Sequence, residues 1–324
     1  MRAVRCHELT GPGSLRVDEL PEPTAGGGQV VIDVKAAGVN FPDVLITRGQ
    51  YQFRPATPFS PGGEAAGIVT AVGAGVTSLA VGDRVATTLI YGAFAERVVA
   101  PEMAVVKLPD AVGFEIGAAT LLTYATTYHA LVDRASIQSG ETLLVLGAAG
   151  GVGIAAVELG ALLGARVIAA ASTPDKLAFC REHGASEGID YSTEDLKERI
   201  KALTKGNGVD VVYDPVGGPL AEQALRGTGW NGRYLVVGFA SGEIPKIPLN
   251  LVLLKGCQIV GVFWGSFAMR EAAKNREHAS KIFAWIAEGK LRPAIDATLP
   301  FARAAEALQR LERREVKGKL VLVP

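Results

Sequence analysis

A glycine-rich turn between an apolar run and a helical pattern limits the possible folds more than any other feature of the sequence. The stretch VLGAAGGVGIAAVELG covers residues 145–160. Before the glycines, LLVL forms the end of a predicted strand, and after them IAAVELGALLG carries apolar residues at helical spacing. A strand, a tight turn and a helix begin a parallel βαβ unit. The stretch therefore predicts an α/β domain built on a parallel sheet.

The same turn matches the dinucleotide-binding pattern GxGxxG over residues 148–153, with alanine in the first place. The central Gly150 would let a pyrophosphate approach the backbone, and Gly153 would let the helix pack closely on the strand. The helix N-terminus would favour the anion. A phosphate-binding P-loop is excluded because Ile154 and Ala155 stand where it needs lysine and serine or threonine. The alternative interpretation is that the glycines are simply small residues where a strand meets a helix. The residues expected to contact the cofactor here are Ala149, Gly150, Gly151, Val152 and Gly153.

The end of the next predicted strand, ARVIAAA, should distinguish NAD from NADP. An NAD-binding domain places an acidic residue about 20 positions after the glycines, where it holds the ribose 2′-hydroxyl. Here Ala171 stands at that place. Ser172 and Lys176 follow and can donate to a 2′-phosphate, and Tyr191 could cover the adenosine edge. These residues predict NADPH as the cofactor. The alternative interpretation is an ordinary turn with one solvated lysine.

The order of strand-like and helix-like patterns along the sequence indicates how the chain is organised. Strand and helix patterns alternate after about Gly113, and the strand runs are continuously apolar, as in a sheet covered by helices on both faces. The first hundred residues instead show short strand-like runs separated by glycine and proline, which favour a barrel or sandwich. A final strand, KLVLVP, follows two helical patterns. The sequence predicts a doubly wound Rossmann domain, residues 123–265, inserted into a β-domain formed by residues 1–122 and 266–324.

Charge and cysteine content exclude several classes of protein. Lys plus Arg and Asp plus Glu number 33 each, and this zero net charge argues against an electrostatic nucleic-acid binder. No apolar run is long enough to predict a membrane span, and residues 1–13 contain no apolar signal core. Cys6, Cys180 and Cys257 are far apart and form no CxxC, so they predict neither disulfides nor a cysteine zinc site. The reducing cytoplasm is the expected location.

Several motifs resemble the zinc-independent quinone oxidoreductases of the medium-chain dehydrogenase/reductase superfamily, and the resemblance covers essentially the whole chain. Residues 38–51, GVNFPDVLITRGQY, are similar to the family segment that carries glycine, asparagine, aspartate, arginine, glycine and tyrosine in this order. In PGGEAAG, residues 61–67, Gly63 occupies the place where zinc-dependent relatives carry histidine. The AAGGVG turn and the GKLVLVP ending are also typical. The resemblance implies a GroES-like β-barrel catalytic domain from the two chain ends, an inserted Rossmann domain, NADPH, a homodimer, and quinones or activated alkenes as substrates.

The resemblance also gives roles to polar residues of the first segment. Asn40 offers donor and acceptor groups near the nicotinamide, or is a turn asparagine after a strand. Asp43 is interpreted as an orienting or helix-start residue rather than an acid, because an ordinary aspartate is ionised at pH 7. Arg48 could brace Asp43, meet an anionic substrate or form a surface ion pair. Tyr51, with a reference pKa of about 10, is a protonated donor to a substrate carbonyl or a residue of the pocket lining.

Residues of the inserted domain complete the expected nicotinamide site. Thr126, in TYATTYHA, matches the family threonine near the nicotinamide, or bonds its own helical backbone. Two segments that follow strands are expected to cradle the nicotinamide amide, with core packing as the alternative for their last two aromatic residues. These segments contain Gly238, Phe239, Val262, Phe263 and Trp264.

The chemistry indicated by these residues is reduction. Without zinc an alcohol is not readily activated as an alkoxide. Hydride delivery to an electrophilic quinone or enone needs only orientation and stabilisation of the developing oxyanion. The prediction is an NADPH-dependent reductase of quinones or α,β-unsaturated carbonyls. Two alternatives stay open: an enoyl-thioester (enoyl-CoA) reductase, and an NADPH-binding, non-catalytic redox sensor or nucleic-acid-binding protein.

We expect the protein to contain no stoichiometric zinc and chelators to leave its activity intact. Gly63 stands in the histidine place, the three cysteines are scattered, and the four histidines show no ligand spacing. Elemental analysis measures the metal content. One transition metal bound per chain, whose removal abolishes activity, would contradict this expectation.

Overall fold

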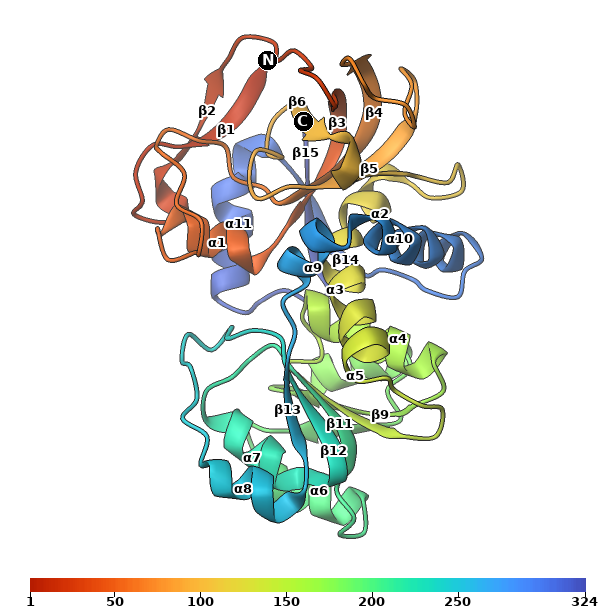
Figure 1. The fold of residues 1–324 in the computed structure, drawn as a ribbon. Helices are drawn as coiled ribbons and strands as arrows, with labels where there is room; N and C mark the ends of the chain where they lie inside the picture. Colours follow the sequence, from red (N-terminus) through yellow and green to blue (C-terminus); the bar gives the residue numbers. More distant parts are fainter. The chain divides into compact units, whose positions relative to one another are not determined.

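The computed structural model describes residues 1–324, which form two compact units (Figure 1). Unit 1 comprises residues 1–122, 270–289 and 293–324, and unit 2 comprises residues 123–269 and 290–292. Each unit has its own sheet and its own hydrophobic core. No helix combines the length and the apolar character that a membrane span requires.

The main sheet of unit 1 takes strands from both ends of the chain. Its order is β14-β15-β3-β4-β5-β7, and β6 also pairs with β3. The strands pair antiparallel except β14 with β15, and β1 and β2 form a separate antiparallel pair. The strands are β1 (Arg2–Cys6), β2 (Leu15–Glu19), β3 (Gln29–Val39), β4 (Glu64–Val72), β5 (Arg84–Thr88), β6 (Arg97–Pro101), β7 (Val105–Lys107), β14 (Ile295–Pro300) and β15 (Lys319–Val323).

The apolar residues of these strands alternate toward a common core. Val30, Ile32 and Val34 of β3 are buried together with Leu320 and Leu322 of β15. Helix α11 covers this core with its alanines and leucine at helical spacing, while its charged residues stay outside. The helices of this unit are α1 (Phe41–Thr47), α2 (Phe114–Ala118), α10 (Ala272–Ala287) and α11 (Ala304–Glu312).

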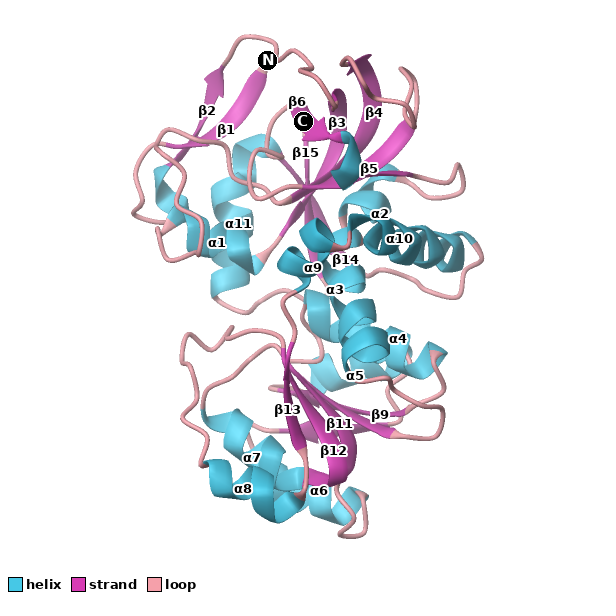
Figure 2. Cartoon of the chain, in the orientation of Figure 1, coloured by secondary structure: helices cyan, strands magenta, loops and turns pink.

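Unit 2 contains a six-stranded parallel sheet in the order β10-β9-β8-β11-β12-β13. The order reverses between β8 and β11, the point at which open α/β sheets bind ligands. Figure 2 shows α4 and α5 on one side of this sheet and α7 and α8 on the other. Because both faces are covered, the strands are buried almost throughout. The strands are β8 (Thr142–Leu146), β9 (Arg166–Ala171), β10 (Glu187–Asp190), β11 (Val209–Asp214), β12 (Thr228–Val236) and β13 (Gln258–Gly261), and the helices are α3 (Thr126–Tyr128), α4 (Gly151–Leu162), α5 (Pro174–Glu182), α6 (Leu196–Leu203), α7 (Pro219–Gly227), α8 (Leu249–Lys255) and α9 (Trp264–Arg270).

Two helical predictions differ in detail from the structure. The segment that reads as one helix after Gly113 divides into α2 and a longer stretch, in which π-helical turns at Leu121–Ala125 and His129–Arg134 flank α3. The sequence from Ser266 onward predicts one helix, but the structure has two, α9 and α10, separated at Glu271. Apolar spacing with the α-helical period does not reveal these variants, because π-turns occur mostly as single turns inside longer helices.

Candidate active site

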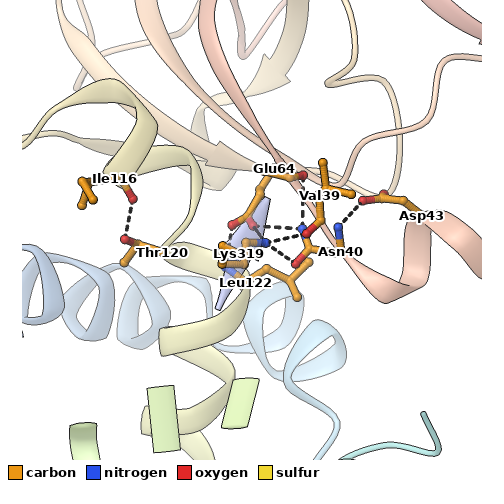
Figure 3. Close-up of polar contacts among 9 residues, drawn as sticks. Val39, Asn40, Asp43, Glu64, Ile116, Thr120, Leu122 and Lys319 are labelled. Atoms are coloured by element: carbon orange, nitrogen blue, oxygen red, sulfur yellow. Dashed lines mark hydrogen bonds and ion pairs between the residues drawn. The ribbon is translucent and has the colours of Figure 1, made fainter. Parts of the chain in front are cut away.

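A buried polar network lies at the end of β3 in unit 1 (Figure 3). Asn40 follows β3, while Glu64 begins β4 and Lys319 begins β15. The register pairs Gly38 with Glu64 and Val39 with Leu320, so three neighbouring strands bring these side chains together. Asn40 Nδ2 donates to Glu64 Oε1 at 2.9 Å, and Asn40 Oδ1 accepts from Lys319 Nζ at 2.6 Å. The Asn40 amide is therefore fixed on both sides.

Lys319 and Glu64 form an ion pair inside the unit. Lys319 Nζ lies 2.6 Å from Glu64 Oε1, and the two side chains are only 4% and 1% exposed. The ammonium also donates to the carbonyl oxygen of Val39 at 3.0 Å. Glu64 Oε2 accepts from the backbone N–H of Leu122 at 2.9 Å. Both charges are thus compensated by good hydrogen bonds, which a buried ion pair needs in order to be tolerated.

Asp43 occupies the first turn of α1, which Asn40 caps. Its Oδ2 accepts from the backbone N–H of Asn40 at 2.8 Å, so the helix-start position predicted for Asp43 is confirmed. Burial raises the pKa of this carboxyl group to about 7; the Asn40 N–H and the Lys319 charge act in the opposite direction, and the Glu64 charge adds to the rise. The reference value of an exposed aspartate therefore does not apply to Asp43, and its role as an orienting residue rather than an acid stays a prediction.

Tyr51 follows α1 and packs against the small apolar cluster of Cys6, Ile46 and Phe59. Burial raises the pKa of its phenol above the usual range, and the negative charge of Asp43 adds to this effect. The phenol is therefore protonated at neutral pH, as a hydrogen-bond donor must be. Its contact with a substrate stays a prediction.

Arg48 faces away from this network. Its Nε donates to Glu312 Oε1 of α11 at 2.6 Å, and the arginine side chain is 42% exposed. Of the three interpretations of Arg48, the structure shows the surface ion pair. The idea that Arg48 braces Asp43 is not supported, because the guanidinium binds Glu312 and the Asp43 carboxylate instead accepts from the Asn40 N–H. A role toward an anionic substrate stays a prediction.

Gly63 lies beside Asp43. A side-chain carbon at this position would lie 3.8 Å from Asp43 Oδ1 and 3.4 Å from the Leu89 carbonyl oxygen, in ordinary contact. No group of three or more His, Cys, Asp or Glu side chains in residues 1–324 is arranged to hold a metal ion. The metal content itself stays a prediction.

The glycine turn of unit 2 contains one glycine that close packing requires, Gly153, and one that packing does not require, Gly150. A side-chain carbon at Gly153 would lie 2.3 Å from the carbonyl oxygen of Gly147, so this glycine lets α4 pack against the turn after β8. At Gly150, the N-cap of α4, the nearest atom would be that same oxygen at 3.4 Å. The protein's own packing thus does not require glycine at 150. The open space at the helix N-terminus fits a phosphate that approaches the backbone.

The residues expected at the ribose lie at the same edge of the sheet. Tyr191, after β10, donates its N–H to the carbonyl oxygen of Ala171, the last residue of β9, at 3.1 Å. Lys176 lies in the first turn of α5, whose N-cap Thr173 accepts from the Lys176 N–H at 3.2 Å. Ser172 directly follows Ala171 in the chain and is half-buried. Because β8, β9 and β10 are parallel neighbours, their carboxyl ends bring these residues to the side of the glycine turn.

The sequence patterns assign no role to Asp190, a carboxylate near this edge. Asp190, the last residue of β10, pairs in register with Ala171. Its Oδ1 accepts from the Ser192 N–H at 3.0 Å and from the Ser192 hydroxyl at 2.6 Å. The side chain therefore closes its own turn, and this use of the carboxylate is compatible with the NADP prediction.

The residues expected at the nicotinamide follow β12 and β13, at the same edge. The Val262 N–H donates to the carbonyl oxygen of Val236 at 2.9 Å, and the Gly238 N–H donates to the backbone carbonyl oxygen of Asp214 at 3.3 Å. These bonds fix both loops to the sheet. Phe239 and Phe263 are 39% and 56% exposed, so core packing is wrong for Phe263, whereas it describes the buried Trp264. Cofactor contact stays a prediction for all of these residues.

Two neighbouring threonines, Thr126 and Thr127, lie in the helical stretch of residues 121–134. Thr126 begins α3 and is half-buried. The next residue, Thr127, donates from Oγ1 to the Thr123 carbonyl oxygen at 2.8 Å and lies 2.9 Å from the Tyr213 hydroxyl. Thr127 therefore bonds its own helical backbone. Both interpretations of Thr126, the nicotinamide role and a bond to its own backbone, stay predictions.

Two residues of the network were given no role by the sequence. Glu64 and Lys319 lie in recognised motifs, but 255 positions separate them. The available signal is a charged residue at the start of an otherwise apolar strand run, EAAG and KLVLV. Such a charge is buried at a cost unless it has a partner.

Comparisons with known proteins agree with this architecture. Residues 26–110 match the alcohol dehydrogenase GroES-like domain and residues 151–280 the zinc-binding dehydrogenase domain. The chain is 41% identical to quinone oxidoreductase-like protein 2 homolog of Nematostella vectensis, over 99% of this chain and 88% of that protein. It is 36% identical to a quinone oxidoreductase of Pseudomonas aeruginosa, over 97% of both chains. The crystal structure of Escherichia coli quinone oxidoreductase complexed with NADPH superposes with a TM-score of 0.93 at 32% identity, over 100% of both chains.

A GroES-like unit with a parallel-sheet Rossmann unit defines a medium-chain dehydrogenase/reductase. Within that superfamily the chain belongs to the quinone oxidoreductase family. The predicted fold class and the predicted family are confirmed.

The two glycines of the turn should respond differently to substitution. Gly153→Ala should destabilise the protein by about 1 to 3 kcal/mol, because its methyl group meets the Gly147 backbone. Gly150→Ala is the matched control, with an expected loss within about 1 kcal/mol, yet it should weaken dinucleotide binding. Thermal unfolding and NADPH titration measure the two effects. Equal stability losses would show that both glycines serve packing alone.

Proposed function

We propose that the protein is an NADPH-dependent reductase of quinones or α,β-unsaturated carbonyls, acting by direct hydride transfer without zinc. The observation that carries the proposal is the glycine at position 150, where packing within the protein does not exclude a side chain and the backbone at the N-terminus of α4 is left open to a phosphate. The E. coli relative was crystallised with NADPH. Family membership further favours an oxidoreductase.

The residues of unit 2 are suited to hold NADPH in three places. The backbone of residues 149–153 would bind the pyrophosphate, with Ser172, Lys176 and Tyr191 at the 2′-phosphate. The nicotinamide would meet Thr126 and the loops after β12 and β13, which contain Gly238, Phe239, Val262, Phe263 and Trp264. When bound, NADPH supplies the hydride.

The residues of unit 1 would orient the acceptor. The protonated phenol of Tyr51 can donate a hydrogen bond to a substrate carbonyl oxygen and stabilise the negative charge that develops there. The Asn40 amide, fixed by Lys319 and Glu64, offers a group of defined orientation to the reacting pair.

We place the enzyme in the cytoplasm, because its three cysteines are all free and buried.

A panel of acceptors tests the proposal. NADPH oxidation is measured with quinones, enones and enoyl-CoA esters, and the expected result is turnover of the first two. Turnover of enoyl-CoA esters alone would make the protein an enoyl-thioester reductase. NADPH binding without turnover of any acceptor would favour a sensor or nucleic-acid-binding role.

Lys176→Ala tests the cofactor choice. A charge-assisted hydrogen bond contributes about 1.5 to 3 kcal/mol, and exposure at the adenosine end keeps this contact near the lower limit. The Michaelis constant for NADPH should rise about tenfold. Turnover should stay nearly unchanged, because the contact is equally strong before and during the reaction.

Two more variants and a comparison of NADH with NADPH complete the test of the cofactor choice. Ala171→Asp should weaken NADPH further by like-charge repulsion. Lys201→Ala, at an exposed lysine in the last turn of α6, is the control and should change nothing. A wild type that prefers NADH, or an equal effect of Lys176→Ala on NADH and NADPH, would refute the pocket assignment.

We infer that two copies associate through β13, which is an edge strand of its sheet. Ile259 of β13 is 39% exposed, and Leu249, Leu253 and Leu254 of α8 are 72 to 80% exposed. An exposed apolar edge is an association hazard unless it is paired, and a two-fold axis would pair it with itself. Light scattering should give twice the 33.8 kDa chain mass at micromolar concentration.

A lysine substitution tests the location of this interface. Ile259→Lys should shift the mass toward a monomer. Val81→Lys, at a 65% exposed position of unit 1, is the control and should leave the mass unchanged. A monomeric wild type would overturn the inference.

A further inference from the structure

The hydrogen bonds around Lys319 permit only one orientation of the Asn40 amide. An ammonium has three donors and no acceptor, and those of Lys319 reach Val39 O, Asn40 Oδ1 and Glu64 Oε1. The oxygen of the amide must therefore face Lys319. A flipped amide would place its NH2 group against the ammonium and its oxygen against the Glu64 carboxylate.

The same bonds decide what Asn40 can offer to a ligand. Its NH2 group donates to Glu64 Oε1 at 2.9 Å and to the Gly38 carbonyl oxygen at 3.3 Å, which uses both hydrogens. A carbonyl oxygen has two lone pairs, and Lys319 takes one. Asn40 thus has no donor left for a bound molecule, and at most the second lone pair of its oxygen remains as an acceptor.

The charges of this pair also act on Asp43. The charged or titratable groups that influence Asp43 are Lys319 from β15, Glu64 from β4 and Tyr51 from the segment after α1. Arg48, on the same helix as Asp43, pairs with Glu312 instead. Burial is the largest influence and raises the pKa of Asp43, the Lys319 charge lowers it, and the Glu64 charge raises it. Asp43 Oδ2 also accepts from the Asn40 N–H at 2.8 Å, so Asp43 is joined through Asn40 to the Glu64 and Lys319 pair.

We propose that Glu64 and Lys319 are positioning residues of the active site, which hold the Asn40 amide in one orientation and set the charge on Asp43. The inference rests on the proposed reductase function. Stability alone does not account for the pair, because apolar residues of similar volume often stabilise a protein as well as a buried ion pair does. Control of two neighbouring polar groups gives this pair a role that apolar residues could not supply.

Two substitutions with opposite effects test the proposal. Glu64→Gln removes a negative charge, so Asp43 should titrate at a lower pH. Lys319→Met removes a positive charge, so Asp43 should titrate at a higher pH. Each shift should be about one pH unit. Infrared spectroscopy follows the carboxylic-acid band of Asp43, identified as the band that Asp43→Asn removes, and the pH profile of kcat/KM should shift in the same directions.

An exposed ion pair provides the matched control. Glu306→Gln, an equivalent change in an exposed pair with Arg303, should leave the Asp43 band and the pH profile unchanged. Shifts of equal sign, or no shift, would overturn the proposal. If neither variant folds, the wild type still decides: an Asp43 band that titrates below about pH 5, in the range of an ordinary aspartate, would overturn it. A wild type that reduces no acceptor refutes the reductase function, while the spectroscopic titration still tests the influence of the pair on Asp43.

Discussion

A single buried ammonium group, Lys319 Nζ, joins the strands on which the candidate active site is built. Its three hydrogen bonds reach the last residue of β3, the residue that caps α1 and the first residue of β4. Removing one partner of such a pair costs about 3 to 5 kcal/mol, because the other charge is left without compensation. The register of three strands, the start of α1 and the orientation of Asn40 therefore depend on the same contact.

Unit 2 depends on a different constraint, the close approach of backbone to backbone. Gly153 allows α4 to lie against the turn after β8, so the helix N-terminus comes to the carboxyl edge of the sheet. The other cofactor residues reach this edge because the strands are parallel neighbours. Charge positions the groups of unit 1, whereas steric fit positions those of unit 2.

The sequence predicts what is encoded locally. The glycine turn, the alternation of strands and helices, and Asn40 followed three residues later by Asp43 all lie within short windows, and each is found in the structure. The remaining features arise from residues far apart in the chain. Arg48 meets Glu312 across 264 positions and Lys319 meets Glu64 across 255. The pKa of Asp43 follows from burial, which no local pattern of residues reports.

The place of β15 has a consequence for the order in which the protein is made. β15 lies between β14 and β3, so unit 1 cannot complete its sheet until the ribosome has synthesised all of unit 2. Domains generally fold as units during synthesis, the N-terminal one first. Here the unit whose synthesis begins first is the last to be finished, and unit 2 can fold while β3 still lacks its partner. The nascent chain thus acquires its dinucleotide-binding sheet before Lys319 reaches Asn40.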